Sequence, residues 1–188
     1  MKDVKPVESA VRARTRLAIL ESARKILPVK PSASIIEIAE AAGVGRSTIH
    51  RYFSERSELI VELAKHVYRL SDQAIERAKP DTGAPAAALR RIIEEQFELA
   101  PALDFIYNER THREYPELFT EFAPGEAKLG DTIRRASRDD MTLSFEWRAK
   151  VFWSLLRLGA EIVGEGQARH EAIDAIMETL TKGLVKPD

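Results

Sequence analysis

Hydrophobic residues recur every three or four positions in nearly every apolar segment of the chain, rather than every second position. This spacing gathers the apolar side chains on one face of an α-helix. Proline, glycine or a small polar residue separates the segments, as at Pro28 and Pro31 after the first of them. The pattern therefore predicts an all-α protein.

Two short helices are predicted in the first third of the chain. Ser34 and Glu37 have the spacing of a capping box, in which each side chain satisfies a backbone N–H at the start of a helix. Gly43 offers the left-handed conformation that ends this helix. After a tight turn, a second helix is predicted over residues 46–52. Helices this short are stable only when they pack on neighbours.

A longer helix follows, and Ser54 is positioned to cap its start. Its apolar residues recur on one side: Leu59, Leu63, Val67, Leu70 and Ala74. The stretch AKPDTGAPAA breaks this helix, so a domain boundary is expected around residues 79–85. The predicted limits are 1–56 for an N-terminal domain, 57–83 for a connecting helix and linker, and 84–188 for a C-terminal domain.

The second half of the chain repeats the helical pattern, with helices expected over ALRRIIEEQFELA, residues 88–100, and around residues 125–138. The segment SFEWRAKVFWSLLRLGAEIVGEG has apolar residues on two faces, and a helix of this kind must be covered on both. We expect the last two helices of each chain to form a four-helix dimer interface. The predicted interface residues are Leu155, Leu158, Ile162, Ile173, Ile176, Met177 and Leu180. A purely internal core would explain the same pattern.

The composition excludes several classes of site. The chain has no cysteine, so thiol nucleophiles, disulfides and cysteine metal sites are excluded. None of its four histidines has a second histidine three to five residues away, and we expect no metal and no other cofactor. There is no run of about 18 apolar residues and no apolar stretch near the N-terminus, which favours a cytoplasmic protein.

Charge is distributed unevenly along the chain. Residues 1–56 contain eleven Lys and Arg and six Asp and Glu, a net charge of +5, whereas the remaining residues contain eighteen and twenty-four, a net charge of −6. A basic end on an acidic body indicates that the basic end meets a polyanion. Uneven solvated charge would give the same asymmetry.

The glycine-containing stretch GVGRST, residues 43–48, could at first be taken for a phosphate-binding loop. A Walker-type loop fails here, because Glu40 stands in place of its first glycine and Arg46 in place of its lysine. A dinucleotide fingerprint fails as well, because its third glycine is absent and no strand precedes it. Two short helices joined by a tight turn on the basic end instead predict a helix-turn-helix, whose second helix lies in the major groove of DNA.

From Leu17 to Leu63 the sequence resembles the DNA-binding region of the TetR family of bacterial transcriptional regulators. The segments ILESARKIL and IIEIAEAAGVGRSTIHRYFSERSELIVEL carry the resemblance. It implies an N-terminal helix-turn-helix domain that binds DNA and a C-terminal helical domain that binds a ligand and dimerises.

Three residues depart from the family pattern. Gly45 stands where a Ser or Thr is usual, His50 where a Tyr is usual, and Arg56 where a Lys is usual. Glycine also serves as an N-cap, and arginine holds a phosphate as lysine does, so two of the changes are compatible with DNA binding. The imidazole of His50 is shorter than a tyrosine side chain and lacks the phenol. The operator preference of relatives therefore does not transfer directly.

The resemblance implies a role for eight residues in DNA binding. Contacts to base edges or nearby groove atoms are expected from Arg46, Ser47 and His50. Phosphate contacts are expected from Thr48, Tyr52, Arg56 and Ser34. Arg51 fits either role. For Arg12, Arg14 and Arg16, a DNA-binding arm and a solvated coat of the first helix are both open.

An effector pocket is expected among the helices of the second half. Its apolar walls are predicted to be Phe97, Phe105, Tyr107, Trp147, Phe152 and Trp153. Its polar groups are predicted to come from Asn108, His112, Arg113 and Tyr115. Aromatic residues with helical spacing also occur in plain cores, and a surface ion pair would equally explain Arg113.

The predicted function is that of a homodimeric, ligand-responsive repressor on a palindromic operator, with recognition helices roughly 34 to 36 Å apart. A small molecule in the C-terminal domain would shift the dimer away from its DNA-bound form, with the long helix after Ser54 as the lever. A dimeric interaction protein without DNA binding and an activator without an inducer are the alternatives. An enzyme is not expected, because the pairs Glu94/Glu95 and Asp139/Asp140 are adjacent and point apart on a helix.

Overall fold

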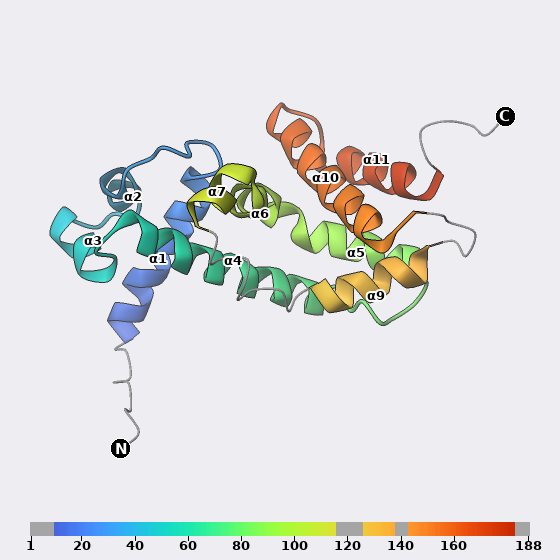
Figure 1. The fold of residues 1–188 in the computed structure, drawn as a ribbon, viewed down its shortest axis with the longest axis horizontal. Helices are drawn as coiled ribbons and strands as arrows, with labels where there is room; N and C mark the ends of the chain where they lie inside the picture. Colours follow the sequence, from blue (N-terminus) through green and yellow to red (C-terminus); the bar gives the residue numbers. More distant parts are fainter. Residues whose placement is uncertain (1–9, 116–125, 138–142, 183–188) are drawn as a thin grey trace, which may run out of the picture. The chain divides into compact units, whose positions relative to one another are not determined.

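The computed structural model describes residues 10–115, 126–137 and 143–182. Every regular element in these ranges is a helix (Figure 1), which confirms the predicted all-α class. No described helix is long and apolar enough to cross a membrane. Asp139 and Asp140 lie outside the described residues.

The chain divides into two compact units, Met1–His66 and Val67–Asp188. The division falls inside the helix α4, Arg56–Arg77, which contributes residues to both units. The loop predicted as a domain boundary belongs to the second unit, where Arg91 donates hydrogen bonds to the carbonyls of Ala78 and Thr82. The functional limits drawn from the sequence, 1–56, 57–83 and 84–188, stay a prediction.

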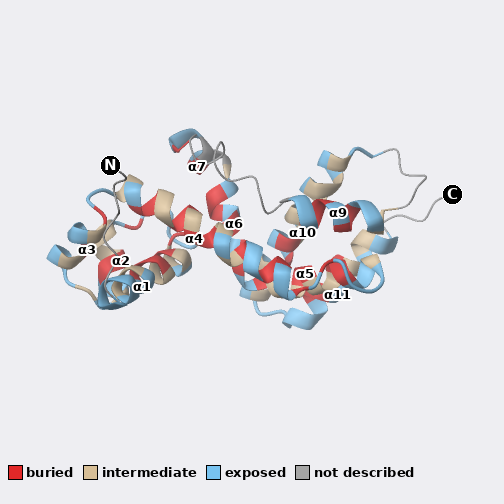
Figure 2. Cartoon of the chain, turned by 90° about the horizontal axis from the view of Figure 1, so that it is seen from below, coloured by how far each residue is buried: buried red, intermediate tan, exposed pale blue. Residues whose placement is uncertain are grey.

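The first unit contains three complete helices and the start of α4. They are α1, Ala10–Ile26; α2, Ile35–Ala41; and α3, Arg46–Tyr52. The helices bury a hydrophobic core (Figure 2), whose largest members are Ile19, Leu27, Ile38, Ile49, Phe53, Leu59, Ile60 and Leu63. The predicted short helices are confirmed, and each is stabilised by this shared core.

Both ends of α2 follow the sequence signals. The Ser34 hydroxyl accepts the Glu37 N–H at 3.2 Å, and Glu37 accepts the Ser34 N–H at 2.7 Å, so the predicted capping box is confirmed. A side-chain hydrogen bond from Lys30, together with the backbone and hydroxyl of Ser34, lowers the pKa of Glu37 to about 2. At the other end Gly43 has φ of 67°, and the Val44 N–H reaches the Ala39 carbonyl at 2.9 Å. This is a Schellman closure.

The start of α4 differs from the prediction. The helix begins at Arg56, two residues beyond Ser54. The hydroxyl and the N–H of Ser54 both donate to the Glu58 carboxylate, at 2.9 and 2.8 Å. The expectation that the Ser54 hydroxyl caps the helix by accepting a backbone hydrogen bond is therefore wrong. The residue directly before the helix is Glu55, whose carbonyl accepts the Leu59 N–H at 3.3 Å, so Ser54 lies one position too early to cap the helix.

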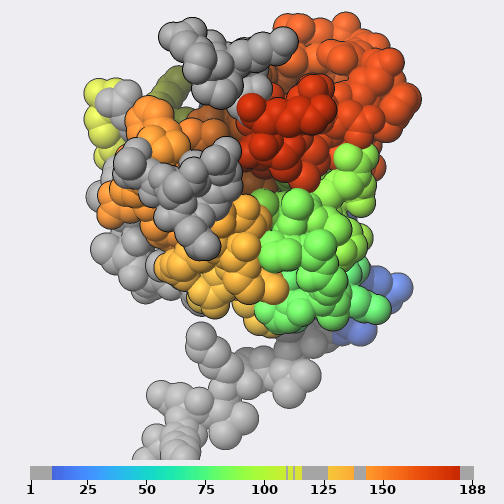
Figure 3. Space-filling view, turned by 90° about the vertical axis from the view of Figure 1, so that its right-hand side faces the viewer, coloured from blue at the N-terminus to red at the C-terminus, as the bar shows by residue number. Residues whose placement is uncertain are grey.

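The second unit contains the end of α4 and the remaining described helices. They are α5, Pro85–Gln96; the 3₁₀ turn η1, Phe97–Leu99; α6, Ala100–Tyr107; α7, Glu109–Glu114; α9, Glu126–Ala136; α10, Phe145–Gly164; and α11, Arg169–Lys182. On one face of this unit α11 lies beside α5, which in turn lies beside α9 (Figure 3). A shared core of buried side chains joins α5, α9, α10 and α11.

The two-faced pattern of α10 has a structural cause within the unit. Phe152, Leu156 and Gly159 are buried on its inner face. At Gly159 the backbone comes so close to α11 that a Cβ atom would lie 2.7 Å from Cδ1 of Ile176. Ile173 and Ile176 are each only 4 % exposed within their own chain, so their assignment to a dimer interface is corrected: they are core residues.

Candidate DNA interface and effector cavity

Helix α3 is held by its inner side. Ile49 and Phe53 are fully buried, and the Gly45 carbonyl accepts the first helical N–H groups, from Thr48 at 2.9 Å and Ile49 at 3.1 Å. Gly45 has φ of −72° and provides no side-chain cap. The backbone N–H groups of the first turn are therefore not occupied by a capping side chain.

The outer side of α3 carries polar and basic side chains. Arg46, Ser47, His50 and Arg51 are exposed, while Thr48 and Tyr52 are half-buried. The side chains of Arg46, Ser47 and His50 make no hydrogen bond within the described part of the chain. Their donors and acceptors are thus free for an external partner.

The ring of Tyr52 has two arginines close to it. The guanidinium carbons of Arg51 and Arg12 each lie 5.8 Å from its centroid, within the range of a cation–π contact. Arg12 comes from α1, so the N-terminal helix and α3 add positive charge at the same ring. This placement favours phosphate contact for the group. Arg16 is instead ion-paired with Glu62 of α4, and Arg14 donates to the Ala10 carbonyl at 3.3 Å.

Two of the residues predicted to contact DNA are committed within the protein. The guanidinium of Arg56 donates to the carbonyls of Pro31 and Ala33, at 2.6 and 3.2 Å, and thereby ties α4 to the loop before α2. The hydroxyl of Ser34 donates to Glu37 in the capping box. Phosphate contacts from these two residues stay a prediction, and the structure adds a positioning role for each.

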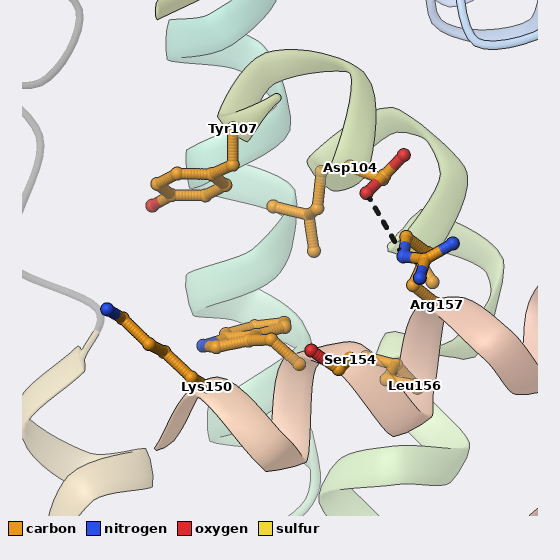
Figure 4. A pocket seen from close by; sticks show the side chains of 9 residues that line it. Asp104, Tyr107, Lys150, Ser154, Leu156 and Arg157 are labelled. Carbon is orange, nitrogen blue, oxygen red and sulfur yellow. Dashed lines mark ion pairs between the residues drawn. The ribbon is translucent and has the colours of Figure 1, made fainter. Parts of the chain in front are cut away.

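A cavity of about 470 Å³ lies in the second unit, between α6 and α10 (Figure 4). Its lining consists of Ala100, Leu103, Asp104, Tyr107, Lys150, Trp153, Ser154, Leu156 and Arg157. The Trp153 indole packs edge-on against the buried ring of Phe152, with centroids 5.4 Å apart. Tyr107 stands edge-on to Tyr68, with centroids 5.7 Å apart. Both lining aromatic rings are thus held by a neighbouring ring.

Only part of the predicted pocket lines this cavity. Tyr107 and Trp153 do so, but Phe97, Phe105 and Phe152 are buried in the core and do not. Trp147 is 57 % exposed and also lies outside the lining, as do Arg113, Asn108 and Tyr115. His112 lies in α7, and its side chain is outside the described part of the structure. Three of the six predicted rings are therefore core residues, because a phenylalanine ring buries a large apolar area there.

One end of the cavity carries a charged cluster that the sequence reasoning missed. The Nε atom of Arg157 lies 3.5 Å from Oδ1 of Asp104, and its Nη1 donates to Oε2 of Glu161 at 3.2 Å. Burial raises the pKa of Asp104, the nearby Glu161 carboxylate adds to this, and Arg157 opposes it without cancelling it. The sequence signal was available, because Asp104 is the one charged residue in the apolar segment ALDFIY.

Both members of the adjacent acidic pair Glu94/Glu95 are ion-paired with arginines. Glu94 lies 3.1 Å from Arg90, and Glu95 lies 2.7 Å from Arg77. Among the described residues no group of three metal-ligating side chains occurs.

Comparison with known proteins agrees with this arrangement. Residues 19–63, which contain both short helices, match the family described as bacterial regulatory proteins, tetR family. The chain is 44 % identical over 179 residues to the HTH-type transcriptional repressor LfrR of Mycolicibacterium smegmatis, with 95 % of each chain covered. The chain belongs to the TetR family. It is therefore a helix-turn-helix DNA-binding transcriptional regulator.

Solved TetR-type structures extend the likeness to the second unit. The crystal structure of LfrR in complex with proflavine superimposes with a TM-score of 0.85 and covers 95 % of this chain and all of that one. FadR of Bacillus subtilis, solved with stearoyl-CoA, has a TM-score of 0.63 at 16 % identity and shows the shared fold alone. NfxB of Pseudomonas aeruginosa is 34 % identical over 77 residues, 41 % of each chain.

Proposed function

We propose that this TetR-family protein is a homodimeric repressor that leaves its operator when an aromatic small molecule binds the second unit. The observation that carries the proposal is that α3 has one buried apolar face and one exposed polar face. Ile49 anchors it inside, while Arg46 and His50 present uncommitted polar groups outside. This is the chemistry that base edges and phosphates require.

The roles within the interface follow from the side-chain positions. Arg46, Ser47 and His50 read the groove, and the Arg51–Tyr52–Arg12 group neutralises phosphates. Arg56 and Ser34 fix the loop and helix that precede α3, so their effect on DNA passes through its placement. Because different residues carry these roles, each role can be tested by its own substitution.

The homodimer is proposed to form through α10 and α11, in agreement with the bundle expected from the sequence. Leu158 is 44 % exposed, and Leu155, Ile162, Met177 and Leu180 are half-buried, so these five still have surface to bury against a second copy. Since a dimer is typical of the family and operators are read by paired recognition helices, a palindromic site is expected. The protein would act in the cytoplasm, where that DNA lies.

Effector release is proposed on two grounds. LfrR, which is similar to this chain over nearly all its length, is named as a repressor and has been solved with proflavine. The cavity between α6 and α10 presents two aromatic rings, Tyr107 and Trp153, that suit a flat aromatic molecule. Residues of α4 belong to both units, which makes this helix the natural connection between effector and DNA.

The test begins with selection of bound fragments from genomic DNA by the purified full-length protein. Fluorescence anisotropy on a recovered site then gives the affinity, its salt dependence and the effect of added proflavine. Replacing Arg46 and Arg51 together by alanine should weaken binding and reduce the slope of log K against log salt by about 0.9 for each DNA phosphate that is no longer neutralised. The matched control replaces Lys25 and Arg69, two exposed basic residues outside α3.

Equal binding by the α3 double variant and its control would overturn the assigned interface. An absence of selected fragments would favour the interaction-protein alternative. Tighter DNA binding upon addition of proflavine would indicate a co-repressor or activator mode rather than release. A sedimentation measurement showing a monomer at micromolar concentration would contradict the proposed homodimer.

A further inference from the structure

The cavity between α6 and α10 has a marked charge asymmetry. Asp104 and Arg157 lie together at one end, while Lys150 stands at the opposite end (Figure 4). Leu103 and Tyr107 of α6 and Trp153 of α10 also line the cavity. A flat aromatic molecule bound in this cavity would lie near a carboxylate at one end only.

The carboxylate of Asp104 is half exposed, and its pairing within the protein is loose. Its contact with Arg157 is an ion pair at 3.5 Å, and no described residue donates a hydrogen bond to it. Burial raises its pKa despite the nearby guanidinium. A second cation brought against Asp104 would therefore gain a charge-assisted hydrogen bond that the protein alone does not make.

Arg157 also pairs with a second carboxylate, that of Glu161. Its Nη1 already donates to Glu161, one turn further along α10, at 3.2 Å. Arg157 can give up its longer contact with Asp104 and stay paired with Glu161. The exchange leaves every charge with an opposite charge, which avoids the cost of an unpaired ion in a partly enclosed site.

We propose that this cavity takes positively charged planar aromatic molecules by counter-ion exchange, in which the ligand cation replaces Arg157 at Asp104 while Arg157 remains on Glu161. The ligand rings lie against Tyr107 and Trp153, whose faces also favour cations. The proposal rests on the proposed effector function and goes further by naming the charge of the effector and the residue that recognises it. Asp104 is the specificity-determining group, and Arg157 is its built-in competitor.

The test is direct titration of the full-length protein without DNA, using two probes. Proflavine is a three-ring aromatic cation, and acridine has the same three-ring frame but is uncharged slightly above neutral pH. Asp104→Asn should weaken proflavine binding about tenfold, the scale of one charge-assisted hydrogen bond, and leave acridine binding unchanged. Asp131→Asn is the matched control, since Asp131 also pairs with an arginine but lies outside the cavity lining.

Two further variants separate exchange from a general effect of charge or folding. Arg157→Gln removes the competitor and should tighten proflavine binding about threefold, a gain that a folding defect cannot produce. Glu161→Gln removes the alternative partner and should weaken proflavine binding in the wild-type background. In the Arg157→Gln background it should have little effect, because no arginine then needs relocation.

Several outcomes would overturn the exchange. These are an equal loss of both probes in Asp104→Asn, no loss of either, weaker proflavine binding in Arg157→Gln, or a Glu161→Gln effect of the same size in both backgrounds. Failure of the proposed function looks different. Proflavine would bind with the expected dependence on Asp104, while operator affinity in the anisotropy assay would not change on its addition.

Discussion

The Glu21 carboxylate of α1 and the His66 ring of α4 are joined by a hydrogen bond of 2.7 Å between Oε1 and Nε2. His66 is only 7 % exposed, and the other carboxylate oxygen of Glu21 accepts from Arg24 at 2.8 Å. An ion pair between Arg16 and Glu62 joins the same two helices. Polar contacts therefore supplement the hydrophobic core in fixing α1 against the first part of α4.

The Glu21 link predicts a pH-dependent stability. Burial acts to raise the pKa of Glu21, but hydrogen bonds from Arg24 and His66 outweigh it and the pKa is lowered from 4.5. A carboxyl whose pKa is lower in the folded than in the unfolded protein stabilises the fold above the unfolded value, and this stabilisation is lost as the pH falls through the folded value. Glu21→Gln should thus lower the free energy of unfolding by about 1 kcal/mol at neutral pH.

Urea denaturation followed by circular dichroism between about pH 7 and pH 3 would measure this effect. The difference between wild type and Glu21→Gln should shrink below pH 4.5, the ordinary value for this carboxyl. Glu40→Gln is the matched control, since Glu40 is exposed and has no ion pair within the described residues. A difference that is the same at both ends of the pH range would show that the Glu21 charge has no role in stability.

The features that sequence predicted well are local ones. The capping box of Ser34 and Glu37 and the left-handed Gly43 depend on residues within a few positions of each other, so their spacing alone specifies them. The cavity depends on how α6 packs against α10, about fifty residues later in the chain. The spacing of aromatic residues does not encode that packing, so it cannot distinguish the core residues Phe97 and Phe152 from residues that line the cavity.

The two glycines of the turn should respond oppositely to substitution. Gly43 has φ of 67°, so Gly43→Ala forces an L-residue into the left-handed region and should cost about 1 kcal/mol. Gly45 has an extended backbone with open space around it, and Gly45→Ser supplies the side-chain cap that α3 lacks. This change should stabilise the protein by about 0.3 kcal/mol. Chemical denaturation of both variants would show the opposite signs, and a loss of stability in Gly45→Ser would contradict the cap geometry.

His50 is expected to set sequence preference rather than overall affinity for DNA. It is exposed on the outer face of α3 without a hydrogen bond to a described residue. His50→Tyr should change discrimination at one base pair of each half-site by about 1 to 3 kcal/mol and leave the salt slope unchanged. Repeating the fragment selection with the variant measures the first effect, and anisotropy against salt concentration measures the second. His170→Tyr, at an exposed histidine of α11, provides the control.

An altered salt slope in His50→Tyr with an unchanged recovered sequence would instead place His50 at a phosphate. The two outcomes differ because phosphate contacts release counterions whereas base contacts select sequence. The phosphate role proposed for Arg51, as against a base contact, is tested by the same pair of measurements on Arg51→Ala.

The crossing of α10 and α11 predicts coupled effects of two core substitutions. A Cβ atom at Gly159 would meet Cδ1 of Ile176 at 2.7 Å, so Gly159→Ala requires a shift in a packed core and should cost about 1 to 2 kcal/mol. Ile176→Val removes that Cδ1 atom and should cost about 1 kcal/mol alone. Because the smaller side chain makes room for the new methyl group, the double variant should be more stable than the sum of the two losses implies.

Gly164→Ala tests whether this cost comes from the contact or from the helix itself. Gly164 is the last residue of α10, and a Cβ atom there would meet nothing within 4 Å. Alanine is the better helix former, so this control should leave the free energy of unfolding unchanged or raise it by up to about 1 kcal/mol. Strict additivity of Gly159→Ala and Ile176→Val in chemical denaturation would mean that the two side chains do not share the space. In that case the close approach of α10 to α11 would not be what requires glycine at position 159.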